Sequence, residues 1–331
     1  MIFPILRGFV SPHLAPLTVF LFAINLFVFL ATYDEYERTD ARMDELITDR
    51  AFLETQGSAF SVMISRDPAK FSRTLIELAR KSYSGDVESR KILGSLAIRN
   101  VEFMTQATDY EFGGDEVAVA DWRGKFKELK SLQFEHPSYL WGISRLKTQW
   151  VQFITYQFSH SGFLHLFWNM VFLLIFGMFI ETKLGGSFVV VTYFGGGLLG
   201  AWIFSQLSGI SSAPLVGASA AVSALIALVG FGWLSREKIR FFFWLLPAEG
   251  YFGFVALPSW LVLIVSLIPD VSGYLAASQD FGSVAYAAHL GGALWGFVIA
   301  MSLDRGWLVE ENDPSSPAAP PSSDHRPGAR I

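Results

Sequence analysis

The chain of 331 residues is too apolar for an ordinary water-soluble protein, because 52% of its residues are hydrophobic and 31 are phenylalanine. Its formal net charge of −5 is small and gives no indication of a nucleic-acid partner. It contains no cysteine, which excludes a disulfide framework and thiolate chemistry and says nothing about the compartment.

Six apolar runs approach the length needed to cross about 30 Å of hydrocarbon. They lie at about 14–32, 162–180, 186–206, 217–234, 252–268 and 284–303. Charged sequence follows the first run where a signal peptide would carry a small-residue cleavage site, so we expect a retained transmembrane helix. The sequence therefore predicts an all-α polytopic membrane protein with six spans.

A long charged segment, 34–148, separates the first span (within 1–33) from the other five (within 149–303). Asp67-Pro68 predicts an N-cap and a first helical residue, a second helix is expected from about 86 to 105, and a third amphipathic piece near 122–132. We expect a small, mainly helical, soluble insertion. Its function stays open, and contact with a substrate or with a partner protein is our working hypothesis.

The short loops predict the orientation in the membrane. Arg236, Lys238 and Arg240 lie between the fourth and fifth spans, whereas the connections 207–216 and 269–283 contain no Lys or Arg. Positive charge favours the cytoplasmic side. We therefore expect a multi-pass protein of the plasma membrane with both termini in the cytoplasm and the insertion outside.

The end of the chain has a different composition. Five prolines lie among serine and alanine after Asp313, and this composition predicts a disordered cytoplasmic tail over 304–331.

Four polar side chains are expected at one depth near the extracytoplasmic surface. His165 and Asn169 are four residues apart and share one face of span two, Ser219 begins span four, and His289 lies about one and a half turns into span six. Ionisable and reactive groups inside a membrane are costly, so each is a functional hypothesis by default.

This set of residues suits acyl transfer. A serine hydroxyl becomes nucleophilic when an imidazole within hydrogen-bond reach removes its proton, and His289 is the candidate base for Ser219. The first N–H groups of a helix have no internal partner and can stabilise an oxyanion, with Gly217 and Ala218 leaving that backbone open to approach. Asn169 and His165 would add side-chain donors. We expect no acid at this depth, and therefore a Ser-His dyad rather than a triad.

These motifs resemble the rhomboid intramembrane serine proteases over about 137–303. The matching pieces are His160-x4-His165-x3-Asn169, Gly217-x-Ser219 followed by Ala224-Leu225, Ala288-His289-x2-Gly292-x3-Gly296, Glu181, and Gly195-Gly196-Gly197-x2-Gly200. The resemblance implies a six-helix rhomboid bundle that cleaves transmembrane proteins within or beside their membrane spans without a cofactor. It assigns Ser219 as nucleophile, His289 as base, and His165 and Asn169 to the oxyanion site.

Two positions depart from the family pattern. Ala220 stands where a glycine is common and adds a methyl group beside the nucleophile. Ser223 stands where some members have an aromatic ring that stacks on the catalytic histidine. These departures leave room for an alternative function, a rhomboid-like pseudoprotease that binds membrane proteins without cutting them.

Several residues have competing interpretations. His160 lies off the face of His165, and we weigh equally a bond to loop backbone and a place lining the site. Glu181 is expected to brace the cytoplasmic end by hydrogen bonds, and the glycines of spans three and six to permit close helix contacts. No zinc motif is present, so no metal is expected. A transporter would need paired ionisable residues at the midplane, which the sequence lacks.

Overall fold

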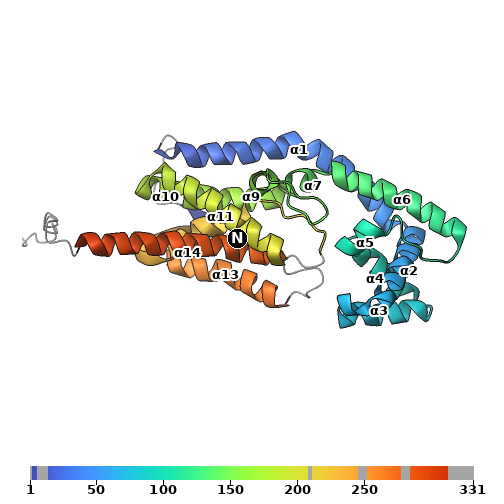
Figure 1. Cartoon of the computed structure of the whole chain (residues 1–331). Coiled ribbons are helices and arrows are strands. Elements are labelled where there is room, and N and C mark those ends of the chain that lie inside the picture. The colour runs from blue at the N-terminus through green and yellow to red at the C-terminus, as the bar shows by residue number, and fades with distance from the viewer. Residues whose placement is uncertain (1, 6–13, 208–210, 245–251, 277–283, 312–331) are drawn as a thin grey trace, which may run out of the picture.

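The computed structural model describes residues 2–5, 14–207, 211–244, 252–276 and 284–311. Apolar helices form a bundle, and the insertion lies at one end of it (Figure 1). The bundle contains α1 (Pro16–Thr48), α9 (Phe163–Phe172), the π-helical turn η4 (Leu173–Gly177), α10 (Met178–Leu184), α11 (Gly186–Leu207), α12 (Ser219–Gly230), α13 (Ser259–Ala276) and α14 (Val284–Glu311).

Four described helices are long and apolar enough to cross a membrane: Pro16–Thr48, Phe163–Leu184, Gly186–Leu207 and Tyr286–Asp304. The apolar helices α12 and α13 are shorter. The chain is therefore a multi-pass membrane protein by this measure, and the count of six spans stays a prediction. The outer face of α1 carries exposed apolar side chains, among them Phe20, Phe27 and Leu30, which is typical of a surface in contact with lipid.

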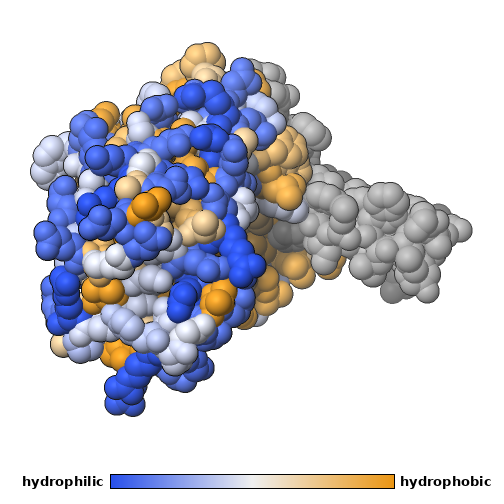
Figure 2. Space-filling model, turned by 90° about the vertical axis from the view of Figure 1, so that its right-hand side faces the viewer, coloured by the Kyte–Doolittle hydropathy of each residue, from blue (hydrophilic) through white to orange (hydrophobic). Residues whose placement is uncertain are grey.

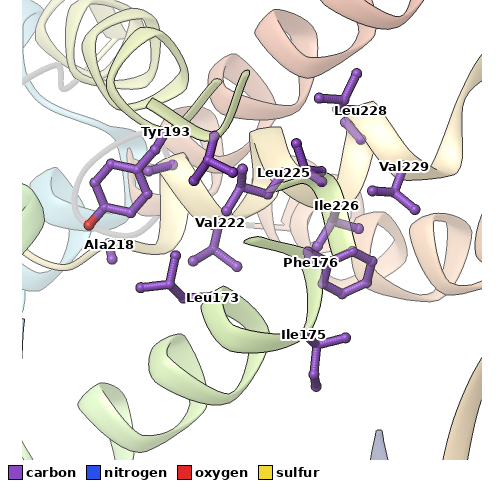
Figure 3. Packing of buried hydrophobic residues seen from close by; sticks show 14 of the residues in the cluster. Leu173, Ile175, Phe176, Tyr193, Ala218, Val222, Leu225, Ile226, Leu228 and Val229 are labelled. Atoms are coloured by element: carbon purple, nitrogen blue, oxygen red, sulfur yellow. The ribbon is translucent and has the colours of Figure 1, made fainter. Parts of the chain in front are cut away.

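The short helix α12 lies at the centre of the bundle. Ten of its 12 residues are buried, and one face packs on Leu173 and Phe176 of η4 and Tyr193 of α11 (Figure 3). A helix surrounded by other helices does not need the length of a span exposed to lipid. Its central position fixes the start of the helix, where Ser219 lies, among the surrounding helices.

The prediction of a purely helical fold is wrong in one place. An antiparallel sheet joins β1 (Ile2–Ile5), β2 (Lys238–Trp244) and β3 (Phe252–Pro258) in that order. The fifth apolar run, 252–268, is therefore a strand up to Pro258 and a helix only from Ser259. Short apolar runs rich in aromatic residues do not distinguish a strand from a buried helix by pattern alone.

The fifth helix also ends later than expected. We predicted a connection at 269–283, but α13 continues through Pro269 to Ala276. Proline inside a membrane helix is tolerated where neighbouring groups satisfy the backbone it frees. In the same way α14 continues to Glu311, so 304–311 of the predicted tail is helical, whereas 312–331 lies outside the described residues.

The insertion is mainly helical, as predicted, but two of its helices begin or end at other residues than expected. It comprises the end of α1, α2 (Arg50–Arg66), η2 (Pro68–Lys70), α3 (Arg73–Tyr83), α4 (Val87–Ala97), α5 (Val101–Gln106), α6 (Glu116–Glu135) and α7 (Pro137–Trp141). Asp67-Pro68 begins only the short turn η2, because Ser72 caps α3. The helix expected over 86–105 is divided in two by Asn100, which caps α5. A separate apolar core, built around Phe60, Phe103 and Trp122, holds these helices together.

The insertion contacts the loop that leads to Ser219. The backbone N–H of Ser212 donates to the carbonyl of Arg99 at 2.7 Å, and Ser212 Oγ donates to the carbonyl of Ile98 at 2.8 Å. Further along this loop, Leu215 pairs with Ile143. The insertion therefore lies at the same end of the bundle as the start of α12. Figure 2 looks onto this end, where hydrophilic residues cover most of the visible face.

Glu181 braces the opposite end of the bundle, as predicted. Its carboxylate accepts hydrogen bonds from the backbone N–H of Leu17 at 2.9 Å and of Thr18 at 2.8 Å, and from the Thr18 hydroxyl at 2.7 Å. A negative charge at the start of α1 is also favoured by the helix dipole. This contact joins α10 to α1, which is far away in the sequence.

Candidate active site

Ser219 and His289 lie in direct contact. Ser219 is the first residue of α12, His289 lies five residues after the start of α14, and Nε2 of His289 is 2.8 Å from Ser219 Oγ. That distance is normal for a hydrogen bond from a hydroxyl to an imidazole nitrogen. The predicted pair of nucleophile and base is therefore brought together by the contact between these two helices.

Glycines make this helix contact possible. A Cβ atom on Gly292 would lie 1.9 Å from the carbonyl oxygen of Ala220, and one on Gly296 would lie 2.1 Å from that of Ala224. Both values are far below any real contact of a Cβ atom. The interpretation of these glycines as close-contact positions is confirmed, and they determine how near His289 comes to Ser219.

Gly217 holds the backbone before Ser219 in a conformation that favours glycine, with φ at +108°. A Cβ atom here would lie 2.6 Å from Cε1 and Nε2 of His165. His165 therefore packs directly on the loop that carries the nucleophile. The side chain of Asn169 donates to the carbonyl of His165 at 2.9 Å, within α9. The sequence placed His165 and Asn169 beside Ser219, and the three residues line one groove.

His160 is fully buried and bonds loop backbone, the first of its two predicted interpretations. Its Nε2 accepts from the backbone N–H of Ala218 at 3.4 Å. The backbone N–H of Gly217 is also occupied, because it donates to the carbonyl of Tyr156 at 2.8 Å. Both residues before Ser219 thus use their N–H groups to anchor the loop. The remaining backbone donors for an oxyanion are those of Ser219 and the first turn of α12.

Asp270 reaches the imidazole from a third helix. Its Oδ1 lies 2.6 Å from Nδ1 of His289, and the Asp270 side chain is only 12% exposed. The expectation that no acid lies at this depth is therefore wrong. It failed because the fifth span was expected to end at about 268, which left Asp270 in the connection 269–283. The signal that could have found it is an aspartate within one or two turns of an apolar run, which is costly in a membrane unless paired.

The two departures from the rhomboid pattern have different consequences. The methyl group of Ala220 is buried on the side of Gly200, where an added Cβ atom would lie 2.7 Å from it, and Ala220 does not line the groove. It therefore does not narrow access to Ser219. Ser223 does line the groove, one turn after Ser219, and leaves that face of His289 without an aromatic neighbour on α12.

A groove of about 1040 Å³ opens onto these residues. Its walls come from α9, α12, α13 and α14, with Leu257 of β3 at one edge. Apolar side chains form most of the wall, namely Leu164, Trp168, Phe172, Val222, Ile226, Leu257, Leu261, Val262 and Val265. The polar side chains are His165, Asn169, Ser219, Ser223, Ser266, Asp270 and His289. An apolar groove with a few convergent polar groups is the usual form of a binding site.

Within the described part of the chain, no three His, Cys, Asp or Glu side chains form a group that could hold a metal ion. The expectation of chemistry without metal or cofactor stays a prediction.

Part of the bundle is similar to known proteins. The Rhomboid domain matches residues 147–305. "Rhomboid protein 1, mitochondrial" of Saccharomyces cerevisiae is 29% identical over 167 residues, 50% of this chain and 43% of that protein. "Rhomboid-like protein 11, chloroplastic" of Arabidopsis thaliana is 31% identical over 159 residues, 47% of this chain and 53% of that protein. "Rhomboid-related protein 3" of Homo sapiens is 33% identical over 116 residues, 34% of this chain and 28% of that protein. The matched region thus spans about half or less of each relative.

Proposed function

Because the chain belongs to the rhomboid family, we propose that it is an intramembrane serine endopeptidase that cleaves other membrane proteins near the extracytoplasmic face. The observation that carries this proposal is the 2.8 Å contact between Ser219 Oγ and Nε2 of His289 in an apolar groove. A pseudoprotease has no chemical need for this contact.

The reaction follows from the geometry. Ser219 Oγ attacks the carbonyl carbon of the scissile peptide bond while its proton passes to Nε2 of His289. The oxyanion is stabilised by first-turn N–H groups of α12 and by the side chains of His165 and Asn169. When the C–N bond breaks, His289 gives its proton to the leaving amine. A water molecule then attacks the acyl-serine ester by the same route and regenerates the hydroxyl.

The groove supports a transmembrane segment as substrate. Its apolar walls on α9 and α13 match an apolar chain, and Ser219 lies at the start of α12 rather than at its middle. A helix satisfies its own backbone and does not present a carbonyl to a nucleophile, so the substrate must unwind locally. Small, helix-destabilising residues at the cleavage point are therefore favoured.

The site of action follows from the loop charges. We place the protein in the plasma membrane with six spans, both termini in the cytoplasm, and the insertion and active site outside. Two relatives carry mitochondrial and chloroplastic in their names. Protease added to intact cells should digest the insertion and spare the tail, whereas an organelle location or reversed orientation would protect the insertion.

The test of activity is cleavage of a single-span reporter by the detergent-purified protein, together with labelling of Ser219 by a fluorophosphonate. Ser219→Ala and His289→Ala should abolish cleavage, and His289→Ala should also abolish labelling. Ser205→Ala is the matched control, because Ser205 is a membrane-helix serine whose hydroxyl donates to the Ala201 carbonyl on its own helix. Reporter binding without cleavage or labelling would favour the pseudoprotease.

A further inference from the structure

Asp270 is a carboxylate in a membrane helix, six residues before the end of α13. At 1.5 Å per residue this is about 9 Å below the end of the helix. His289 lies about 7.5 Å below the start of α14 by the same rule. The two side chains therefore lie at matching depths, and Asp270 is the only carboxylate among the described residues that line the groove.

The contact determines where the imidazole proton lies. An ionised carboxylate can only accept hydrogen bonds, so at 2.6 Å Nδ1 of His289 must carry the proton that it donates to Asp270 Oδ1. In a neutral imidazole, Nε2 then has the free lone pair. That lone pair faces the Ser219 hydroxyl, which is the arrangement needed to remove its proton.

The other neighbours of His289 do not supply this function. Ser219 on α12 is the proton donor, whereas His165 on α9 lines the same groove and makes its side-chain hydrogen bond to the Ser161 hydroxyl, which lies 3.2 Å from its Nδ1. Ser223 offers no ring to stack on the imidazole. The hydrogen bond to Asp270 on α13 thus orients the histidine in place of an aromatic residue on α12.

We propose that Asp270 is a positioning residue, so that Ser219, His289 and Asp270 act as a triad built from three helices. This inference rests on the proposed protease function. During attack the proton moves from Ser219 Oγ to Nε2, and the proton on Nδ1 stays where it is. The carboxylate stabilises the positive imidazolium that forms and keeps the ring in one orientation.

Asp270→Asn is the sharpest test, because asparagine has nearly the same shape but no charge, and it has an NH2 donor in place of one carboxylate oxygen. Its amide N–H can donate to Nδ1, which moves the imidazole proton to Nε2 and blocks acceptance of the Ser219 proton. We expect kcat for reporter cleavage and the rate of fluorophosphonate labelling to fall by about 10²-fold to 10⁴-fold. KM should not rise, and the unfolding temperature should not fall.

A second variant and a control keep the test specific. Asp270→Glu retains a carboxylate and should be at least about tenfold faster than Asp270→Asn. Ser272→Ala, two residues away on the exposed face of α13, should behave as wild type, since the Ser272 hydroxyl donates to the Pro269 carbonyl of its own helix.

The outcomes separate the inference from the proposed function. A wild-type enzyme with Ser219-dependent cleavage, and an Asp270→Asn variant within about threefold of it, would overturn the role of Asp270 and leave the protease intact. An Asp270→Asn variant that loses activity only in proportion to lost stability would overturn it as well. If the wild-type protein shows no Ser219-dependent cleavage or labelling, the proposed function fails, and the role of Asp270 fails with it.

Discussion

The substitution Gly292→Ala should break the hydrogen bond between His289 and Ser219 without changing either side chain. The added Cβ atom would lie 1.9 Å from the Ala220 carbonyl oxygen, and contacts below 3.0 Å are essentially never seen. The helices α12 and α14 must therefore separate by about 1.1 Å, the difference between those two values. Because Gly292 is one turn after His289 and Ala220 follows Ser219, the 2.8 Å hydrogen bond would lengthen toward about 3.9 Å.

The expected cost has two parts. Overpacking a tight contact destabilises a protein by about 1–3 kcal/mol, which should appear as a lower unfolding temperature in detergent. A misplacement of about 1 Å between reacting groups costs about 10²-fold in rate. We therefore expect Gly292→Ala to remain folded but to label with fluorophosphonate about 10²-fold more slowly than wild type.

Gly124→Ala is the matched control, because a Cβ atom on this helical glycine of the insertion meets nothing within 4 Å. It should leave the labelling rate unchanged. A Gly292→Ala variant that labels Ser219 as fast as wild type would refute the reasoning, since the bundle would then tolerate the methyl group without moving His289.

Three further predictions concern the scaffold. Glu181→Gln weakens the hydrogen bonds to the start of α1, including that to Thr18, and should lower the free energy of unfolding by about 1–3 kcal/mol. The folded variant should still be labelled at Ser219 by the fluorophosphonate. An unchanged unfolding temperature would contradict this role of Glu181. Burial lowers the pKa of His136 below its ordinary 6.5, although Asp40 opposes this. The unfolded chain therefore binds a proton more readily than the folded chain, so the stability of the insertion should fall as pH drops below 6.5. His136→Gln should reduce this pH dependence in unfolding curves measured at pH 7.5 and 5.5. An equal loss of stability between the two pH values in wild type and variant would contradict this role of His136. Gly57→Val puts a branched side chain where even a Cβ atom would lie 1.8 Å from a carbonyl oxygen of α4. The clash should loosen the insertion, so that limited proteolysis cuts the insertion and spares the bundle. An insertion that resists the protease as well as wild type does would contradict the close packing of α2 on α4.

The first residues of the helices in the insertion are only partly predictable from the local sequence. Asp86 and Asp115 cap α4 and α6 as helix-start signals should. Asp67-Pro68 carries an equally good signal but begins only a short turn, because Ser72 forms the cap that the longer helix uses. Competing caps a few residues apart are resolved by the packing of the helix that follows, which a local pattern does not contain.

The sequence by itself predicted the membrane character of the chain, a mainly helical insertion, and Ser219, His289 and His165 as candidate site residues at one depth. These features follow from hydropathy, from helical spacing and from the cost of polar groups in lipid, all of which are local properties. Only the tertiary structure decided the sheet of β1, β2 and β3 and the contact of Asp270 with His289. Both depend on where a helix ends and what lies across from it. The helix α13 continues through Pro269 and so carries Asp270 to the imidazole.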